Sequence, residues 1–132
     1  MVVDTSAICA TFFSEPESEV FVNAIVTAPA SYFSAVSLIE ASLLLGATRA
    51  FSPKLLDRFL RQVGIEVLPA TGEIACIAAD AYQRFGKGRH PAGLNFGDVF
   101  SYATAKFLNS PLLYRETTSQ KPMFQQLSHY AK

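Results

Sequence analysis

The stretch LNFGDVFSYATAK at residues 94–106 decides how the rest of the chain is arranged. Apolar residues at helical spacing predict a helix with one buried face, made by Phe96, Val99, Phe100, Ala103 and Phe107. Asn95 is a favourable N-cap, and Asp98 follows three residues later in the first helical turn. A carboxylate there lies at the positive end of the helix dipole and is held ionised. Asp98 therefore suits a helix cap, and it also suits a metal ligand.

The composition limits what the chain can be. Its 132 residues fit one domain, and 50% hydrophobic with 17% charged residues is typical of an ordered globular fold. Basic and acidic residues balance at 11 each, so binding of nucleic acid would need a local patch. Cys9 and Cys76 lack metal-type spacing and are expected to be buried free thiols. Without a signal segment or a membrane-spanning stretch, we expect a cytoplasmic protein.

Strand and helix patterns alternate along the chain. Short strands are predicted at residues 1–4, 30–34, 65–69 and 112–114. Helices are predicted at 7–13, from 15 onward, from 37 onward, from 52 to 63, at 71–85 and at 94–106. Ser37 and Glu40 match the capping box that opens the third of these helices, and Tyr82 is expected to face inward from the fifth. The alternation predicts an α/β fold, a short parallel sheet with helices on both faces.

Three acids are expected to meet at one edge of this sheet. Asp4 ends the first strand, and Glu40 and Asp98 stand near the starts of helices at the same edge. Carboxylate oxygens suit Mg²⁺ or Mn²⁺, which stabilise charge on a phosphodiester and activate water. Each acid also has a purely structural interpretation: Asp4 as an N-cap, and Glu40 and Asp98 as members of capping boxes. Only their combined placement favours a metal and catalytic site.

Three further residues are candidates for contact with a substrate. Lys87 and Arg89 lie on a glycine-rich loop that leads directly to Asp98, where they could hold phosphate oxygens. Ser6 could hydrogen-bond a ligand carboxylate or a metal-bound water. The loop is not a dinucleotide fingerprint, because it follows a helix rather than a strand.

These motifs resemble those of PIN-domain proteins, most closely the VapC ribonuclease toxins of bacterial toxin–antitoxin pairs. The matching segments are VVDTS at 2–6, IEAS at 39–42 and YQRFGKGRHPAGLNFGD at 82–98. The resemblance runs from Met1 to about Tyr114, within a single domain at residues 1–132. It implies an α/β/α sandwich and assigns the family's acidic residues to Asp4, Glu40 and Asp98, and its small polar residue to Ser6.

The resemblance also implies an activity and partners. The activity would be a Mg²⁺- or Mn²⁺-dependent endoribonuclease, the toxin of the pair. The partners would be an RNA substrate, a VapB-type antitoxin and a second copy in a homodimer. Operator DNA would be bound only through the antitoxin.

The pattern departs from the family after the last strand. The family usually has Gly-x-Asp-Phe there, with an acid where this chain has Thr118. Back-translation of 116–132 in the neighbouring frame permits a start of Gly-Asn-Asp-Phe and a stop codon at the end of the segment. We hypothesise that residues 115–132 are a divergent, frameshifted tail that alters this edge of the sheet, and the DNA sequence of the gene decides it.

Two other functions compete with the nuclease. A PIN domain impaired by the loss of the acid at Thr118 would mainly bind its antitoxin and cleave little. A receiver-like phosphoacceptor domain would need a lysine at a strand end, but Lys106 lies at the end of a predicted helix.

Overall fold

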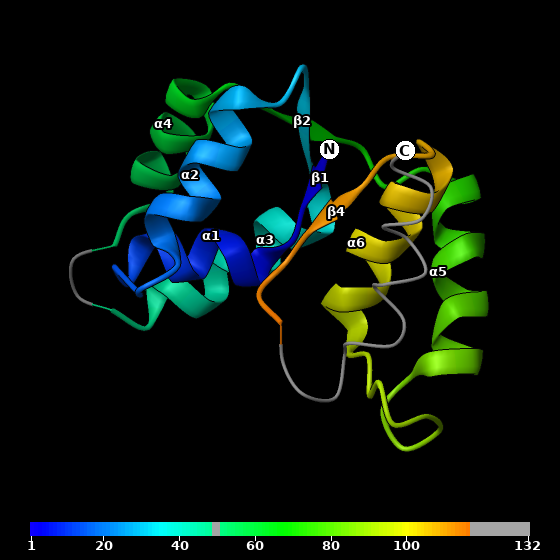
Figure 1. Cartoon of the computed structure of the whole chain (residues 1–132). Coiled ribbons are helices and arrows are strands. Elements are labelled where there is room, and N and C mark those ends of the chain that lie inside the picture. Colours follow the sequence, from blue (N-terminus) through cyan, green and yellow to red (C-terminus); the bar gives the residue numbers. More distant parts are fainter. Residues whose placement is uncertain (49–50, 117–132) are drawn as a thin grey trace.

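A four-stranded parallel sheet forms the centre of the computed structural model, which describes residues 1–48 and 51–116 (Figure 1). The strands are β1 (Val2–Val3), β2 (Ser31–Ser34), β3 (Ile65–Leu68) and β4 (Leu112–Leu113). The helices are α1 (Thr5–Phe12), α2 (Ser18–Thr27), α3 (Ala35–Gly46), α4 (Pro53–Val63), α5 (Gly72–Phe85) and α6 (Phe96–Phe107). The predicted α/β fold with four parallel strands is confirmed.

The order of the strands places β1 at the point where the direction in which strands are added to the sheet reverses. The order is β3-β2-β1-β4, and β1 pairs in parallel with both β2 and β4. The chain therefore builds outward from β1 to β3, and α5 and α6 then carry it back to the opposite side of β1. A crevice beyond the carboxyl end of such a strand is the usual place for a site in an open α/β sheet. Asp4 follows β1 directly.

Helices cover both faces of the sheet. In Figure 1, α2 and α4 lie on one side of the strands and α5 and α6 on the other. Neighbouring residues of β4 contribute to different cores, because side chains alternate across a strand: Leu113 packs with the α1–α4 core and Leu112 with the α5–α6 core. Phe33 of β2 is fully buried.

The start of α3 differs from the prediction. Ser34 is the N-cap and accepts a hydrogen bond from the Val36 amide at 3.2 Å, so Ser37 and Glu40 lie inside the helix. The prediction that Ser37 and Glu40 form a capping box is therefore wrong. Ser37 is instead fully buried, with its hydroxyl 3.0 Å from that of Ser101 on α6. This leaves Glu40 without a structural role as a cap.

The buried face of α6 is also different from the predicted one. Phe96 and Phe107 are 71% and 42% exposed, so the prediction that they are buried is wrong. Gly97, Ser101 and Ala105 are buried instead, at a spacing of four residues. These small side chains allow α6 to pack closely, while Phe100, which was predicted to be buried, is only partly buried and Tyr102 is buried. Val99 and Ala103 are buried as predicted.

Two smaller predictions are corrected as well. Tyr82 is 37% exposed rather than inward-facing, and Cys76 is exposed while Cys9 is half-buried. Both cysteines are free, as expected. Residues 117–132, including Thr118, lie outside the described residues, so the frameshift remains a hypothesis. Among the described helices, none is long and apolar enough to cross a membrane.

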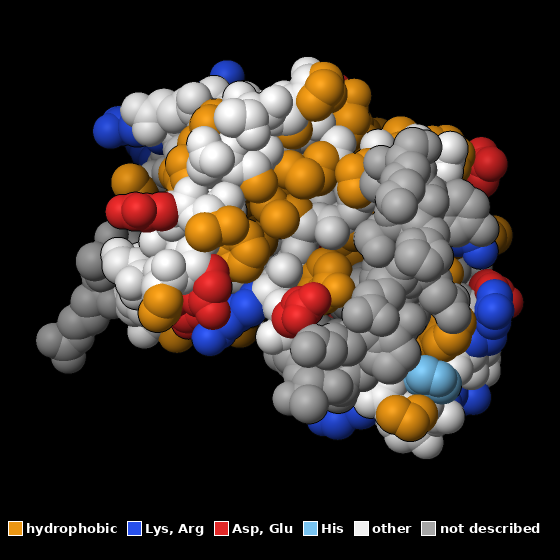
Figure 2. All heavy atoms as spheres, viewed as in Figure 1, with side chains coloured by type: hydrophobic (Ala, Val, Ile, Leu, Met, Phe, Trp, Pro, Cys, Tyr) orange, Lys and Arg blue, Asp and Glu red, His pale blue; other side chains and the backbone are white. Residues whose placement is uncertain are grey.

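The surface over α2 is rich in exposed apolar side chains. Figure 2 shows hydrophobic side chains gathered beside this helix, on the side toward β4. Val20 and Val26 are both exposed there. Only Phe21 and Ile25 of α2 are buried, so part of its apolar surface is left uncovered.

Candidate active site

Asp4 is a buried carboxylate at the switch point of the sheet. The extended backbone at Asp4 ends β1 and makes this residue the N-cap of α1, where Oδ2 accepts a hydrogen bond from the Ser6 amide at 2.9 Å. The interpretation of Asp4 as an N-cap is therefore correct, and this role uses only one of its two carboxylate oxygens. Its other oxygen, Oδ1, is buried and has no hydrogen-bond partner within the described part of the chain. A buried, unpartnered carboxylate oxygen is costly unless a cation or another donor binds it.

Glu40 approaches the site from α3. Burial raises the pKa of Glu40, a hydrogen bond from the Thr5 side chain opposes this, and the charge of Asp4 raises the pKa further. The carboxylate also lies directly against Gly97 of α6. Glu40 is therefore held between the first turns of α1 and α6, next to another acid.

Asp98 completes the group from the first turn of α6. Its amide donates to Asn95 Oδ1 at 2.8 Å and its Oδ2 accepts from the Asn95 amide at 2.9 Å, which confirms the predicted capping box. Burial raises the pKa of Asp98 to about 6, against the hydrogen bond from Asn95, and the charges of Asp4 and Glu40 add to the rise. The expectation that the helix dipole holds this carboxylate ionised is therefore wrong, because burial among other acids disfavours the charged form. Asp98 is thus both a member of the helix cap and a member of the acidic group.

The three acids influence one another electrostatically, as the sequence predicted. Like charges in a partly buried site favour uptake of a proton or binding of a cation. In the described ranges, no group of three or more histidine, cysteine, aspartate or glutamate side chains is arranged to hold a metal ion. The donor set is nevertheless all oxygen, which fits Mg²⁺ or Mn²⁺, and Asp4 Oδ1 is an unused acceptor for such an ion.

Cys9 stands near these acids but is unsuited to chemistry. Burial and the negative charges of Glu40, Asp4 and Glu15 raise its pKa to about 11. The side chain therefore stays a neutral thiol at physiological pH, which makes it a poor nucleophile and a poor metal ligand.

Ser6 has a role that the sequence did not indicate. Its hydroxyl accepts a hydrogen bond from the Arg115 amide at 2.9 Å, and the Arg115 guanidinium pairs with Glu15. Arg115, two residues after β4, is therefore hydrogen-bonded to the first turn of α1, close to Asp4. The hydroxyl hydrogen of Ser6 is still available as a donor.

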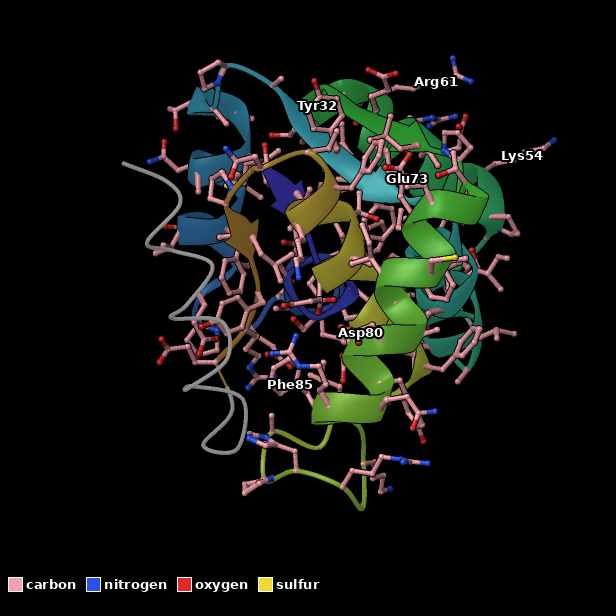
Figure 3. All side chains as sticks on the ribbon, turned by 90° about the vertical axis from the view of Figure 1, so that its right-hand side faces the viewer. Tyr32, Lys54, Arg61, Glu73, Asp80 and Phe85 are labelled. Atoms are coloured by element: carbon pink, nitrogen blue, oxygen red, sulfur yellow. The ribbon has the colours of Figure 1, made fainter. Side chains whose placement is uncertain are left out.

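Lys87 and Arg89 are exposed on the loop between α5 and α6. Figure 3 shows Phe85 at the end of α5, with this loop beyond it. Backbone hydrogen bonds from Lys87 to Leu94 and from Leu94 to Phe85 close the loop at its base. Arg89 Nη1 donates to Gln83 Oε1 at 2.8 Å. The loop is thus anchored next to the Asn95–Asp98 turn.

Two residues that sequence reasoning missed bear on the position of Glu40. Thr5 hydrogen-bonds its carboxylate, and Gly97 makes room for it. The sequence offered no signal for Thr5. For Gly97 there was one, because a glycine inside a helical pattern weakens the helix and commonly has a packing reason.

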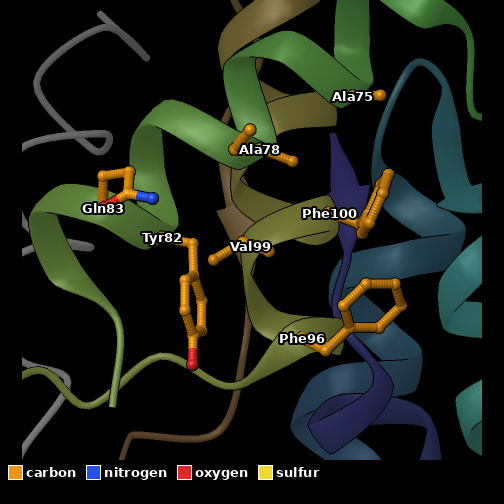
Figure 4. Close-up of a pocket in the computed structure, with 8 residues that line it drawn as sticks. Ala75, Ala78, Tyr82, Gln83, Phe96, Val99 and Phe100 are labelled. Atoms are coloured by element: carbon orange, nitrogen blue, oxygen red, sulfur yellow. The ribbon is translucent and has the colours of Figure 1, made fainter. Parts of the chain in front are cut away.

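An apolar hollow of about 310 Å³ lies between α5 and the start of α6. Figure 4 shows Tyr82 descending from α5, with Phe96 and Phe100 side by side on α6. Small apolar and aromatic side chains make up most of the lining of the hollow.

Comparison with known proteins agrees with this architecture. The PIN domain model matches residues 1–121. "Ribonuclease VapC" of Mycolicibacterium smegmatis is 38% identical over 117 residues, which cover 87% of this chain and 90% of that protein. "Ribonuclease VapC42" of Mycobacterium tuberculosis is 39% identical over 117 residues, covering 87% of this chain and 89% of that protein.

Solved structures share the fold at lower sequence identity. The crystal structure of Mycobacterium tuberculosis VapC20, described as a sarcin-ricin loop cleaving toxin, has a TM-score of 0.71 at 16% identity, covering 93% of this chain and 95% of that one. A toxin–antitoxin complex from Klebsiella pneumoniae has a TM-score of 0.69 at 16% identity, with 92% and 91% covered. The chain belongs to the PIN-domain family, and within it to the VapC proteins.

Proposed function

We propose that this chain is a divalent-metal-dependent endoribonuclease, the toxin of a toxin–antitoxin pair acting in the cytoplasm. The observation that carries the proposal is the group Asp4, Glu40 and Asp98, which converges at the switch point of the sheet with Asp4 Oδ1 buried and unpartnered. The names of the VapC relatives support ribonuclease activity.

The three carboxylates would hold Mg²⁺ or Mn²⁺, and the ion would stabilise charge on the phosphodiester and lower the pKa of the attacking water. A cation would also relieve the mutual repulsion that raises the pKa of Asp98. The Asn95 turn fixes the direction of Asp98, and the Thr5 side chain lies beside the Glu40 carboxylate.

The substrate would be held by residues around this group. Lys87 and Arg89 supply positive charge on the anchored loop, where they would bind phosphate oxygens of RNA. The Ser6 hydroxyl, positioned by Arg115, would donate to a ligand carboxylate or to water on the ion.

Removal of the metal is the direct test. EDTA should abolish cleavage of RNA by the purified chain, and added Mg²⁺ or Mn²⁺ should restore it, because the carboxylates alone cannot neutralise the developing phosphate charge. Cleavage can be followed on total RNA by gel. A preparation carrying Asp98→Asn, purified in the same way, excludes a contaminating nuclease. Cleavage that persists in EDTA would refute the proposal.

The protein partners we propose are a VapB-type antitoxin, with operator DNA bound only through it, and a second copy of the chain. The antitoxin would cover exposed apolar surface such as that over α2. The resemblance to a toxin–antitoxin complex in fold is compatible with this arrangement.

A second apolar surface, on α3 and the start of α6, suits the homodimer. Ile39 and Leu43 of α3 are 61% and 74% exposed, and Phe96 stands out from α6 beside the hollow of Figure 4. Glu40 of α3 touches Gly97 of α6, so the two helices meet here. A surface this apolar suits a permanent partner, because obligate interfaces resemble a core cut in half.

Substitution of Leu43 by aspartate should convert the dimer into a monomer, because a buried unpaired charge is strongly unfavourable at an interface. Light scattering coupled to gel filtration measures the change. Leu55→Asp on α4, another exposed leucine, is the matched control and should leave the mass unchanged. A wild-type chain that is monomeric at micromolar concentration would contradict the dimer.

A further inference from the structure

Gly97 stands at the second position of α6, one residue before Asp98, and it is buried. Its backbone does not require glycine, since the glycines with positive φ among the described residues are Gly64, Gly88 and Gly93. Alanine is the better helix former at such a position. A reason other than backbone conformation must therefore account for the glycine.

That reason is the carboxylate of Glu40. A Cβ atom added to Gly97 would overlap the carboxyl carbon and both oxygens of Glu40, and these are its three nearest neighbours. The carboxylate thus occupies the space that any other side chain would fill. Thr5 hydrogen-bonds the same carboxylate from α1.

We propose that Gly97 is a positioning residue for the metal site: its lack of a side chain lets the Glu40 carboxylate lie against the first turn of α6, beside Asp98. This inference rests on the proposed function, in which Glu40 is a metal ligand. The obstructed group is the end of a flexible side chain, so a methyl group at residue 97 displaces the carboxylate and leaves the helix in place. The consequence falls on ion binding and spares the fold.

The test compares two glycine-to-alanine substitutions in α-helices. Gly97→Ala should weaken Mn²⁺ binding about 10- to 100-fold, the range seen when groups that orient metal ligands are removed. Its thermal midpoint in EDTA should be equal to or above that of the wild type. Gly72→Ala in the first turn of α5 meets no atom within 4 Å and should leave Mn²⁺ binding unchanged. Mn²⁺ binding is measured by titration followed by electron paramagnetic resonance.

A shorter carboxylate should relieve the obstruction. Glu40→Asp withdraws the carboxyl group by one methylene, so Gly97→Ala should cost no further Mn²⁺ affinity in that background. Such non-additivity distinguishes a shared contact from two independent defects. The double variant also keeps the test decisive if Gly97→Ala alone folds poorly. Its thermal midpoint should then equal that of Glu40→Asp, because the shorter side chain no longer meets the added methyl group.

The outcomes separate this inference from the proposed function. A wild-type chain that binds no Mn²⁺ and cleaves no RNA would overturn the proposed function itself. A wild-type chain that binds Mn²⁺, together with a Gly97→Ala variant that binds it equally well, would overturn the positioning role alone. Additive losses in the double variant, or misfolding that Glu40→Asp does not relieve, would do the same.

Discussion

Asparagine in place of Asp4 is expected to lower the rate of RNA cleavage by about 100-fold or more, since loss of groups that merely orient metal ligands already costs 10- to 100-fold. Asparagine keeps an oxygen that can accept the hydrogen bond from the Ser6 amide, so the cap of α1 is preserved. It removes the charge from the buried, unpartnered side of the carboxylate. The variant should therefore fold and yet fail to hold the cation, which cleavage assays over a range of Mg²⁺ concentrations can measure.

The Asp4→Asn substitution should also change the pKa values of the two neighbouring acids. The charge of Asp4 contributes to the raised pKa of Glu40 and of Asp98, so both pKa values should fall in Asp4→Asn. Carbon-13 detected NMR titration of the metal-free protein would report this. Asp57→Asn, which removes an exposed carboxylate paired with Arg61 on α4, is the matched control and should cleave RNA at the wild-type rate. An Asp4→Asn variant with full activity would remove Asp4 from the metal site.

The metal-free chain should lose stability as the pH rises from 4 to 7. Folding raises the pKa of Asp98 from its ordinary 3.8 to about 6, mainly by burial. Between these values the folded state binds more protons than the unfolded state, so the free energy of unfolding decreases with increasing pH. The contribution is fully present below pH 3.8 and is lost as the pH passes through about 6. After allowance for solvent screening of this partly exposed group, it amounts to about 1–2 kcal/mol.

Urea unfolding in EDTA at several pH values measures this effect. Asp98→Asn should reduce the change in the free energy of unfolding with pH, because asparagine does not titrate. The variant should still fold, since asparagine offers an oxygen to the Asn95 amide. Saturating Mg²⁺ should reverse the trend above pH 6, since the ion competes with protons for the carboxylates. A wild-type curve that matches that of Asp98→Asn across the range would show that Asp98 is not perturbed in the folded state.

Local signals in the sequence were sufficient for most elements, and the predicted topology placed the three acids near one another, while their role as a metal site stays a prediction. The Asn95–Asp98 box was predictable because both partners lie within four residues and the cap is a local structure. The strand order was not, since the return of β4 to the far side of β1 depends on long-range packing. Alternating strands and helices fix only that the strands are parallel.

The errors at α3 and α6 share a physical cause. Ser37 looked like a cap, but its hydroxyl finds a partner on α6, and Ser34 at the end of β2 starts the helix instead. Likewise, hydrophobicity alone assigned Phe96 to the core, whereas close packing selects the small residue Gly97 beside it. In both cases a contact between distant segments overrides the local pattern.

Among the strands of residues 1–48 and 51–116, the edge strand β4 is the last to be synthesised. Val2 and Asp4 donate backbone hydrogen bonds to Pro111 and Leu113, so one side of β1 stays unpaired until the ribosome has released β4. Asp98 likewise emerges long after Asp4 and Glu40. A partly synthesised chain thus lacks both the third acid and the neighbouring strand of the site. If the protein cleaves RNA as proposed, translation itself delays its activity until β4 has been made, which gives an antitoxin time to bind.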